Sequence, residues 1–206
     1  MLKLWGRANS INVHKVLWTL DELKVPFERV DAGLHFGVVN TPEYRKLNPN
    51  GKVPTIEDDG LVLWESNAIV RYLAAKHGAG TLWPSDPKQR ADSDRWMDWI
   101  TDSVQLAVGP MFLQLIRTPA EKRDAKIIET SIQKADALFP IMDAALAGRD
   151  YIAGRSLTIG DIPIGVFTHR WFALPIPRPR VPNVEAYYER LKQRPAYRAH
   201  IVKPLT

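Results

Sequence analysis

The 206-residue chain contains no cysteine. This absence excludes disulfide bonds, thiolate zinc sites, iron–sulfur clusters and every mechanism in which a protein thiol is the nucleophile. The five histidines show no metal-ligand spacing, so we predict no metal site. Any sulfur chemistry must therefore come from a bound molecule.

The sequence also lacks a long apolar run. No stretch approaches the ~18–20 residues that a membrane-spanning helix needs, and residues 1–7 lack the apolar segment of a signal peptide. We therefore expect no membrane partner and take the cytoplasm as the compartment. With 45% hydrophobic and 25% charged residues, and with 12 glycines and 16 prolines, the chain has the composition of an ordinary globular protein.

An excess of positive charge gathers at the C-terminal end. The net charge is +5, and residues 175–206 alone carry 7 basic and 2 acidic side chains. No zinc-finger or RNA-binding motif accompanies them, so a solvated basic face is favoured over a polyanion-binding role. We predict no nucleic-acid partner.

Short strands alternate with helices over residues 1–80. Alternation and helical spacing predict strands at 2–4 and 27–30, a helix ending at Lys24, and a short helix after Thr41. Residues 54–57 and 61–64 flank an Asp-Asp-Gly turn and predict a hairpin. Ser66 is suited to cap a helix that ends near His77. The predicted order is β-α-β-α-β-β-α.

The pattern changes after Gly80. Residues 81–87 predict a linker, and residues 88–206 predict an all-helical domain with apolar stripes at three- and four-residue spacing. A threonine followed three residues later by an acid, Thr158 and Asp161, predicts a variant capping box, and Pro195 is expected to begin the final helix. The stripes are expected to form core; they are Trp96, Trp99, Ile100 and Val104, and Ile127, Ile128, Ile132, Ala135, Leu138 and Phe139.

Several of these features occur together in one known family. Val53-Pro54 before a hairpin, Glu65-Ser66 at the next helix, and Thr158-x-x-Asp161 in a helical second half resemble the cytosolic glutathione transferases over essentially the whole chain. The resemblance implies an α/β plus all-α fold: a thioredoxin-like domain at 1–80 and an all-helical domain at 88–206. It also implies a homodimeric enzyme that uses glutathione as co-substrate against a small electrophile.

The segment 9–16 is most similar to bacterial serine- or asparagine-type members, including the Nu-like group. Trp5 and Gly6 stand where the Alpha, Mu and Pi classes carry a tyrosine, and the Beta and Omega cysteine is absent. The resemblance implies that the Ser10 hydroxyl is the main stabiliser of the glutathione thiolate, with the Asn12 amide as a second donor. From residue type alone, both are equally suited to cap the helix, and that alternative stays open.

The same resemblance places the rest of glutathione. It implies a cis Val53–Pro54 bond whose Val53 backbone pairs with the cysteinyl segment, although trans is the commoner state of such bonds. Glu65 and Ser66 suit the ammonium and carboxylate of the γ-glutamyl end. Two residues are candidates for the glycine carboxylate: Lys52 and Asn40.

The second substrate is expected beside the loop after the first strand, against apolar groups of the helical domain. The candidates, each of which is equally a core residue by pattern, are Phe112, Leu115, Ile116 and Trp171. Asp98 or Asp102 is expected to face a partner subunit. The alternative functions are a glutathione-dependent disulfide reductase or peroxidase, then an isomerase, and a non-catalytic glutathione-binding scaffold.

Overall fold

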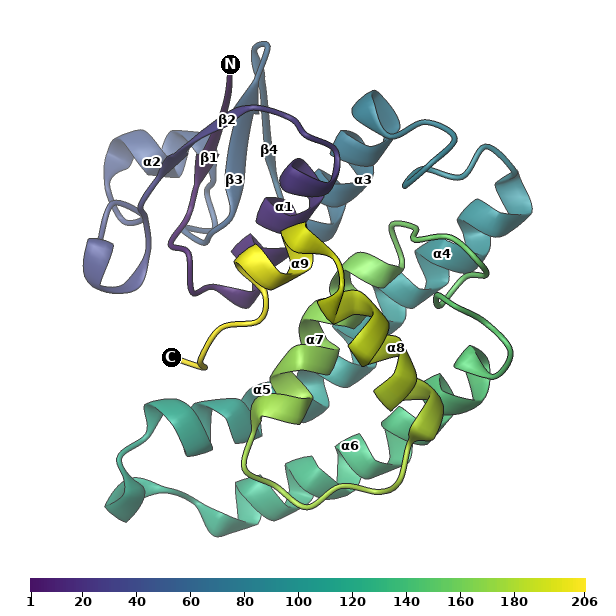
Figure 1. Ribbon diagram of the computed structural model, residues 1–206. Coiled ribbons are helices and arrows are strands. Elements are labelled where there is room, and N and C mark those ends of the chain that lie inside the picture. Colours follow the sequence, from purple (N-terminus) through teal and green to yellow (C-terminus); the bar gives the residue numbers. More distant parts are fainter. The chain divides into compact units, whose positions relative to one another are not determined.

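A computed structural model describes residues 1–206 (Figure 1). The chain forms two compact units, Met1–Trp83 and Pro84–Thr206. The first unit is α/β and the second is all-helical. The predicted fold class is confirmed.

The first unit follows the predicted β-α-β-α-β-β-α order, with one added 3-10 turn. Its four strands form a single sheet in the order β2-β1-β3-β4, in which β1 is parallel to β2 and antiparallel to β3, and β3 is antiparallel to β4. The elements are β1 (Leu2–Trp5), α1 (Ile11–Glu22), β2 (Phe27–Val30), η1 (Leu34–Phe36), α2 (Pro42–Leu47), β3 (Thr55–Asp58), β4 (Leu61–Trp64) and α3 (Ser66–His77).

The core of this unit lies between the sheet and the pair α1 and α3, which lie side by side while α2 stands apart from them (Figure 1). Alternate side chains of β1, Leu2 and Leu4, point into this core, and Val13 is fully buried opposite them. A Cβ atom on Gly6 would lie 2.5 Å from Cγ2 of Val13, so only glycine lets the loop after β1 approach α1 this closely.

The start of α3 differs from the prediction. Ser66 is the first residue of the helix, and Glu65 occupies the cap position with a φ of +72°, a value that residues other than glycine rarely adopt. The Ser66 hydroxyl bonds to side chains of α1 instead of capping α3. The prediction that Ser66 caps the helix is therefore wrong, because tertiary partners take its side chain.

Helices and short helical turns make up the second unit. Two π-helical stretches, η2 and η3, flank α5, which contains Pro110. The elements are α4 (Pro87–Trp99), η2 (Ile100–Val104), α5 (Gln105–Phe112), η3 (Leu113–Arg117), η4 (Ala120–Lys122), α6 (Ala125–Leu146), α7 (Asp161–Ala173), α8 (Pro182–Lys192) and α9 (Pro195–His200).

The predicted apolar stripes form much of the helical core. Trp96, Val104, Ala135 and Phe139 are all buried. Ile127 was expected there too, but it is 39% exposed, because it lies in the first turn of α6 and the buried face of that helix begins at Ser131.

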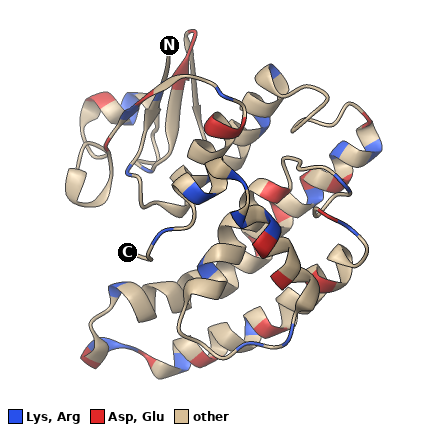
Figure 2. Ribbon diagram, in the orientation of Figure 1, with Lys and Arg blue, Asp and Glu red and all other residues tan.

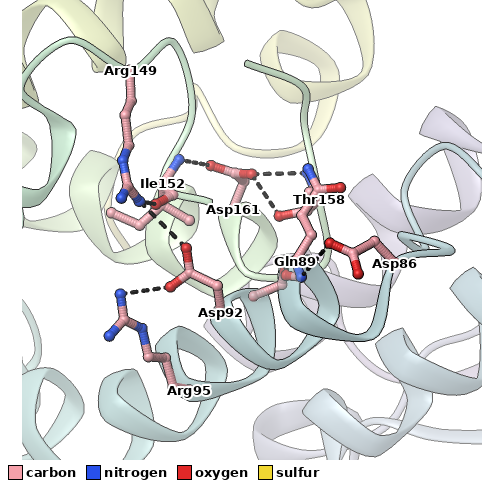
Figure 3. Close-up of polar contacts among 9 residues, drawn as sticks. Asp86, Gln89, Asp92, Arg95, Arg149, Ile152, Thr158 and Asp161 are labelled. Carbon is pink, nitrogen blue, oxygen red and sulfur yellow. Dashed lines mark hydrogen bonds and ion pairs between the residues drawn. The ribbon is translucent and has the colours of Figure 1, made fainter. Parts of the chain in front are cut away.

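Asp161 joins three segments of the helical unit (Figure 3). Its carboxylate accepts the backbone N–H of Ile152 and of Thr158, both at 2.8 Å, and the hydroxyls of Thr158 and Tyr187. Only half of the predicted capping box forms. The Asp161 side chain accepts the Thr158 N–H, as a capping box requires, but the Thr158 hydroxyl donates to Asp161 and does not accept the Asp161 N–H. That N–H bonds to the Thr158 carbonyl. Complete burial raises the pKa of Asp161 to about 6, against the opposing effect of these donors.

The basic side chains of residues 175–206 are spread over α8, α9 and the segments beside them, and acidic and basic groups intermix along α6 (Figure 2). Several have partners within the helical unit. Arg178 donates to backbone carbonyls at the end of α7, Arg190 pairs with Asp150, and Lys192 pairs with Glu189. Part of the positive charge therefore serves local structure. No helix is both long and apolar enough to cross a membrane.

Candidate functional site

Ser10 lies between β1 and α1, at the cap position of the helix. Its backbone is extended (φ −86°, ψ 126°), yet its side chain makes no hydrogen bond to the helix, and the residue is 5% exposed. The structure therefore does not support the capping alternative for Ser10. The hydroxyl instead stands at the N-terminus of a twelve-residue helix, where the helix dipole favours negative charge.

Asn12 and Ser66 meet where α1 and α3 begin. The Ser66 hydroxyl donates to Oδ1 of Asn12 at 3.4 Å, and Ser66 is 6% exposed. Because the Asn12 carbonyl oxygen accepts this bond, the amide group turns its two N–H donors away from Ser66. The predicted donor Asn12 and the predicted carboxylate-binding residue Ser66 are thus direct neighbours.

A third residue, Lys15, belongs to this cluster and was not predicted from the sequence. It lies one turn after Asn12 on α1, is 1% exposed, and donates from Nζ to the Ser66 hydroxyl at 3.3 Å and to Oδ1 of Asn67 at 3.2 Å. A buried ammonium requires partners, because its desolvation is costly. Helical spacing gave no signal for it, because Lys15 lies two residues after Val13, on the side of the helix away from the predicted apolar stripe.

The Val53–Pro54 bond is cis, as the resemblance implies. Val53 lies just outside the β3–β4 ladder, which begins at Thr55. The loop before it is held at the Lys52 carbonyl, which accepts from the Tyr44 hydroxyl at 2.6 Å and from Nδ2 of Asn48 at 3.0 Å. These two side chains also contact the Thr55 hydroxyl, so both ends of the segment 52–55 are fixed.

Burial raises the pKa of the Tyr44 hydroxyl, so this group stays a neutral donor. Tyr44 and Asn48 were not predicted as site residues, because the sequence pattern showed only a short helix and a turn there. Their role follows from three-dimensional contacts with Lys52 and Thr55.

The two candidates for the glycine carboxylate are both exposed. Oδ1 of Asn40 accepts from Arg45 of α2 at 3.0 Å, which leaves its amide N–H groups for other partners. Arg45 also donates to the Pro49 carbonyl at 2.7 Å. Asn40 is therefore connected through Arg45 to the turn that follows α2.

The candidates for the second-substrate pocket divide into two pairs. Trp171 is fully buried and stacks on Phe139 with ring centroids 3.7 Å apart, and Phe112 is 4% exposed beneath the Arg170 guanidinium. These two are packed in the helical unit. Leu115 and Ile116, on η3, are partly exposed.

No group of three or more histidines, aspartates or glutamates that could hold a metal ion is found in the structure. The α/β unit, with a polar cluster at the N-terminal ends of two helices and a cis-proline before β3, together with an all-helical second unit, defines a thioredoxin-like protein of the glutathione-transferase type.

Comparison with known proteins is consistent with this class. The glutathione S-transferase N-terminal domain model matches residues 1–75, and the C-terminal domain model matches residues 97–195. The chain is 42% identical to glutathione S-transferase GstB of Escherichia coli over 208 residues, which covers 100% of both proteins. It is 32% identical to glutathione S-transferase F13 of Arabidopsis thaliana, covering 95% of this chain and 93% of the relative.

A solved structure is also very similar. The theta-class glutathione S-transferase of Xanthomonas axonopodis pv. citri, with glutathione bound, superposes with a TM-score of 0.96 at 45% identity and covers 100% of this chain and 99% of its own. The chain therefore belongs to the glutathione S-transferase family, which confirms the family resemblance.

Proposed function

We propose that this protein is a glutathione transferase that binds glutathione on its α/β unit and activates it as a thiolate for attack on a small electrophile. One observation carries the proposal. Ser10, whose hydroxyl does not cap its helix, and Asn12, whose Oδ1 accepts from Ser66 and whose amide N–H groups point away from that residue, both lie at the N-terminus of α1.

Thiolate formation is the chemical task of these groups. A thiol with a pKa near ~8.5 is mostly protonated at neutral pH, and each unit of depression requires ~1.4 kcal/mol of preferential thiolate stabilisation. Ser10 supplies one O–H donor, Asn12 supplies N–H donors, and the end of α1 supplies positive potential. Ser10 is the main donor in this proposal, and Asn12 assists it.

The remainder of glutathione is proposed to lie in extended form. The N-terminus of α3 and the Ser66 hydroxyl receive the γ-glutamyl carboxylate, and Glu65 receives the ammonium group. The backbone of Val53 pairs with the cysteinyl segment. Lys52, with Asn40 as a weaker candidate, receives the glycine carboxylate.

The reaction needs no covalent intermediate on the protein. The thiol proton passes to solvent, the sulfur forms a bond to the electrophilic atom, and the leaving group departs with the bonding electron pair. Holding both reactants in place adds to the rate by removing the entropy cost of bringing them together. In the helical unit, the partly exposed Leu115 and Ile116 are favoured over the packed Phe112 and Trp171 as groups that touch the electrophile.

A second candidate function is glutathione-dependent disulfide reduction, which the Asn12 amide favours. A turnover panel with glutathione and an aryl halide, an organic peroxide and a small disulfide separates the functions. We expect the aryl halide to give the highest kcat/KM. If the disulfide or the peroxide gave the highest kcat/KM, the protein would be a reductase or a peroxidase and not a transferase. Glutathione binding without any turnover would indicate a non-catalytic scaffold.

We further propose a homodimer in the cytoplasm, in keeping with the resemblance to the cytosolic transferases. Strand β4 is an edge strand of its sheet, and its apolar side chains Leu61, Val62 and Trp64 are 40%, 37% and 37% exposed. Edge strands and exposed apolar groups favour coverage by a partner. In the helical unit, Asp98 and Asp102 are exposed and remain candidates to face the second subunit.

A further inference from the structure

The hydrogen bonds that join Lys15, Ser66 and Asn12 all run in one direction, from Lys15 through Ser66 to Asn12. The Lys15 ammonium donates to the Ser66 hydroxyl oxygen at 3.3 Å, and the Ser66 hydroxyl donates to Oδ1 of Asn12 at 3.4 Å. An ammonium has three donors and no acceptor, whereas a hydroxyl has one proton and two lone pairs. The lysine therefore takes one acceptor position of the Ser66 oxygen and keeps the serine proton pointing away from itself.

We propose that Lys15 is a positioning residue that keeps the Ser66 hydroxyl a donor, with Oδ1 of Asn12 as its acceptor in this structure and the γ-glutamyl carboxylate as its acceptor when glutathione binds. This inference rests on the proposed function. It adds a residue to the proposed site that acts on glutathione only through another side chain.

The alternative directions are unfavourable while Lys15 is present. The proton of Ser66 cannot point at the ammonium, and Lys15 occupies one of the two lone pairs of the Ser66 oxygen. Without the lysine, Ser66 can accept from Asn12 and turn its lone pairs toward the site. It would then meet an incoming carboxylate as an acceptor, which is repulsive.

Burial increases the energetic effect of these donor and acceptor roles. Lys15 is 1% exposed and Ser66 is 6% exposed, so water cannot readily substitute for a lost partner. Hydrogen bonds are stronger and unpaired polar groups more costly in such surroundings. Lys15 is also held from a second side, since Nζ donates to Oδ1 of Asn67 at 3.2 Å. The ammonium is thus fixed beside the residue that it orients.

A double-mutant cycle on the full-length protein tests the inference. The variants are Lys15→Met, which keeps the linear side chain without a donor, Ser66→Ala, and the two combined. Lys46→Met serves as the matched control, because Lys46 is an exposed lysine of α2 outside the site. Titration calorimetry gives the Kd for glutathione, and steady-state kinetics gives kcat and KM.

Each single substitution is expected to weaken glutathione binding about tenfold, because Ser66→Ala removes a hydrogen bond to the charged carboxylate and Lys15→Met removes the orientation of that donor. The double variant is expected to match Ser66→Ala within about twofold, since Lys15 acts through Ser66. KM should rise with little change in kcat, and Lys46→Met should bind like the native chain.

Two results would overturn the inference. One is an unchanged Kd in Lys15→Met. The other is a loss of about a hundredfold in the double variant, which would show that the ammonium attracts the ligand independently of Ser66. If circular dichroism shows that Lys15→Met is unfolded, Lys15→Gln takes its place in the same cycle. A native chain that fails to bind glutathione would refute the proposed function itself, which is a separate outcome.

Discussion

At the residue scale, the central contrast is between a hydroxyl and an amide at one helix end. Ser10 brings a single proton that is not used in capping α1, whereas the Asn12 amide brings two N–H donors. Donors of either kind lower a thiol pKa by stabilising its charged form. In our proposal Ser10 makes the larger contribution to this pKa depression.

Replacing each donor by alanine separates the two contributions. Ser10→Ala is expected to move the pH midpoint of kcat upward by about one to two units, because a hydrogen bond to a charged group contributes ~1.5–3 kcal/mol. Asn12→Ala should give a smaller upward shift. Glutathione affinity should change little in both, and pH–rate profiles with calorimetry provide the measurement.

The reverse ranking would place Asn12 first and favour the disulfide-reducing function. If neither substitution moves the midpoint, both residues have only structural roles, and the backbone and helix dipole alone must hold the thiolate.

At the element scale, most of the fold was predictable because local pattern and tertiary structure agree. Strand alternation in β1 and the turn between β3 and β4 were sufficient to place those elements. The helix starts were harder. Ser66 has the residue type of a cap, but contacts with Lys15 and Asn12, more than fifty residues earlier in the chain, determine where its hydroxyl points.

The same distinction applies to the site. Ser10, Asn12 and Ser66 were predicted as site residues because they match positions of a known motif. Lys15, Tyr44 and Asn48 were not, because no local spacing shows their contacts. The family resemblance, and not residue pattern, predicted the cis Val53–Pro54 bond. A single sequence does not show which side chains, distant along the chain, contact one another in the folded protein.

The contact between α4 and the start of α7 requires a glycine. A Cβ atom on Gly160 would lie 2.7 Å from the Ser93 carbonyl oxygen, a backbone atom that cannot move alone. Gly160→Ala is therefore expected to lower the free energy of unfolding by about 1–3 kcal/mol, as overpacking does. Gly109→Ala is the control, because nothing lies within 4 Å of its added methyl group. Equal denaturation midpoints for the two variants would contradict the account.

The contacts among α7, α8 and the C-terminal segment depend on a neutral histidine. His169 is 8% exposed, with Nδ1 2.8 Å from the Tyr188 hydroxyl and Nε2 3.0 Å from the Lys203 carbonyl. Since the carbonyl only accepts, Nε2 carries the proton and Nδ1 accepts from Tyr188. Burial, aided by the charges of Arg170 and Lys192, lowers the pKa of His169 below its usual 6.5.

The unfolded chain therefore binds more protons at this histidine than the native protein does between the two pKa values. The stability contribution of His169 is present above about pH 6.5 and is lost as the pH falls toward the lowered pKa. Thermal melts across this range should show the loss in the native chain and a flatter profile in His169→Gln. Parallel profiles would show that other groups cause the pH dependence.

At the scale of the whole molecule, the prediction concerns assembly. The exposed apolar edge of β4 and the family resemblance both favour a two-fold homodimer. Light scattering at micromolar concentration should give twice the 23.4 kDa chain mass. A 23.4 kDa species would remove the proposed partner-facing role of Asp98 and Asp102.

The central claim is that the α/β unit binds glutathione and lowers the pKa of its thiol, and the ultraviolet absorbance of the bound thiolate tests it most directly. A pH titration of the native protein with saturating glutathione should show thiolate already present at neutral pH, with a midpoint well below the ~8.5 of an unperturbed thiol. A midpoint near that of glutathione alone, in a protein shown by calorimetry to be saturated, would contradict the account.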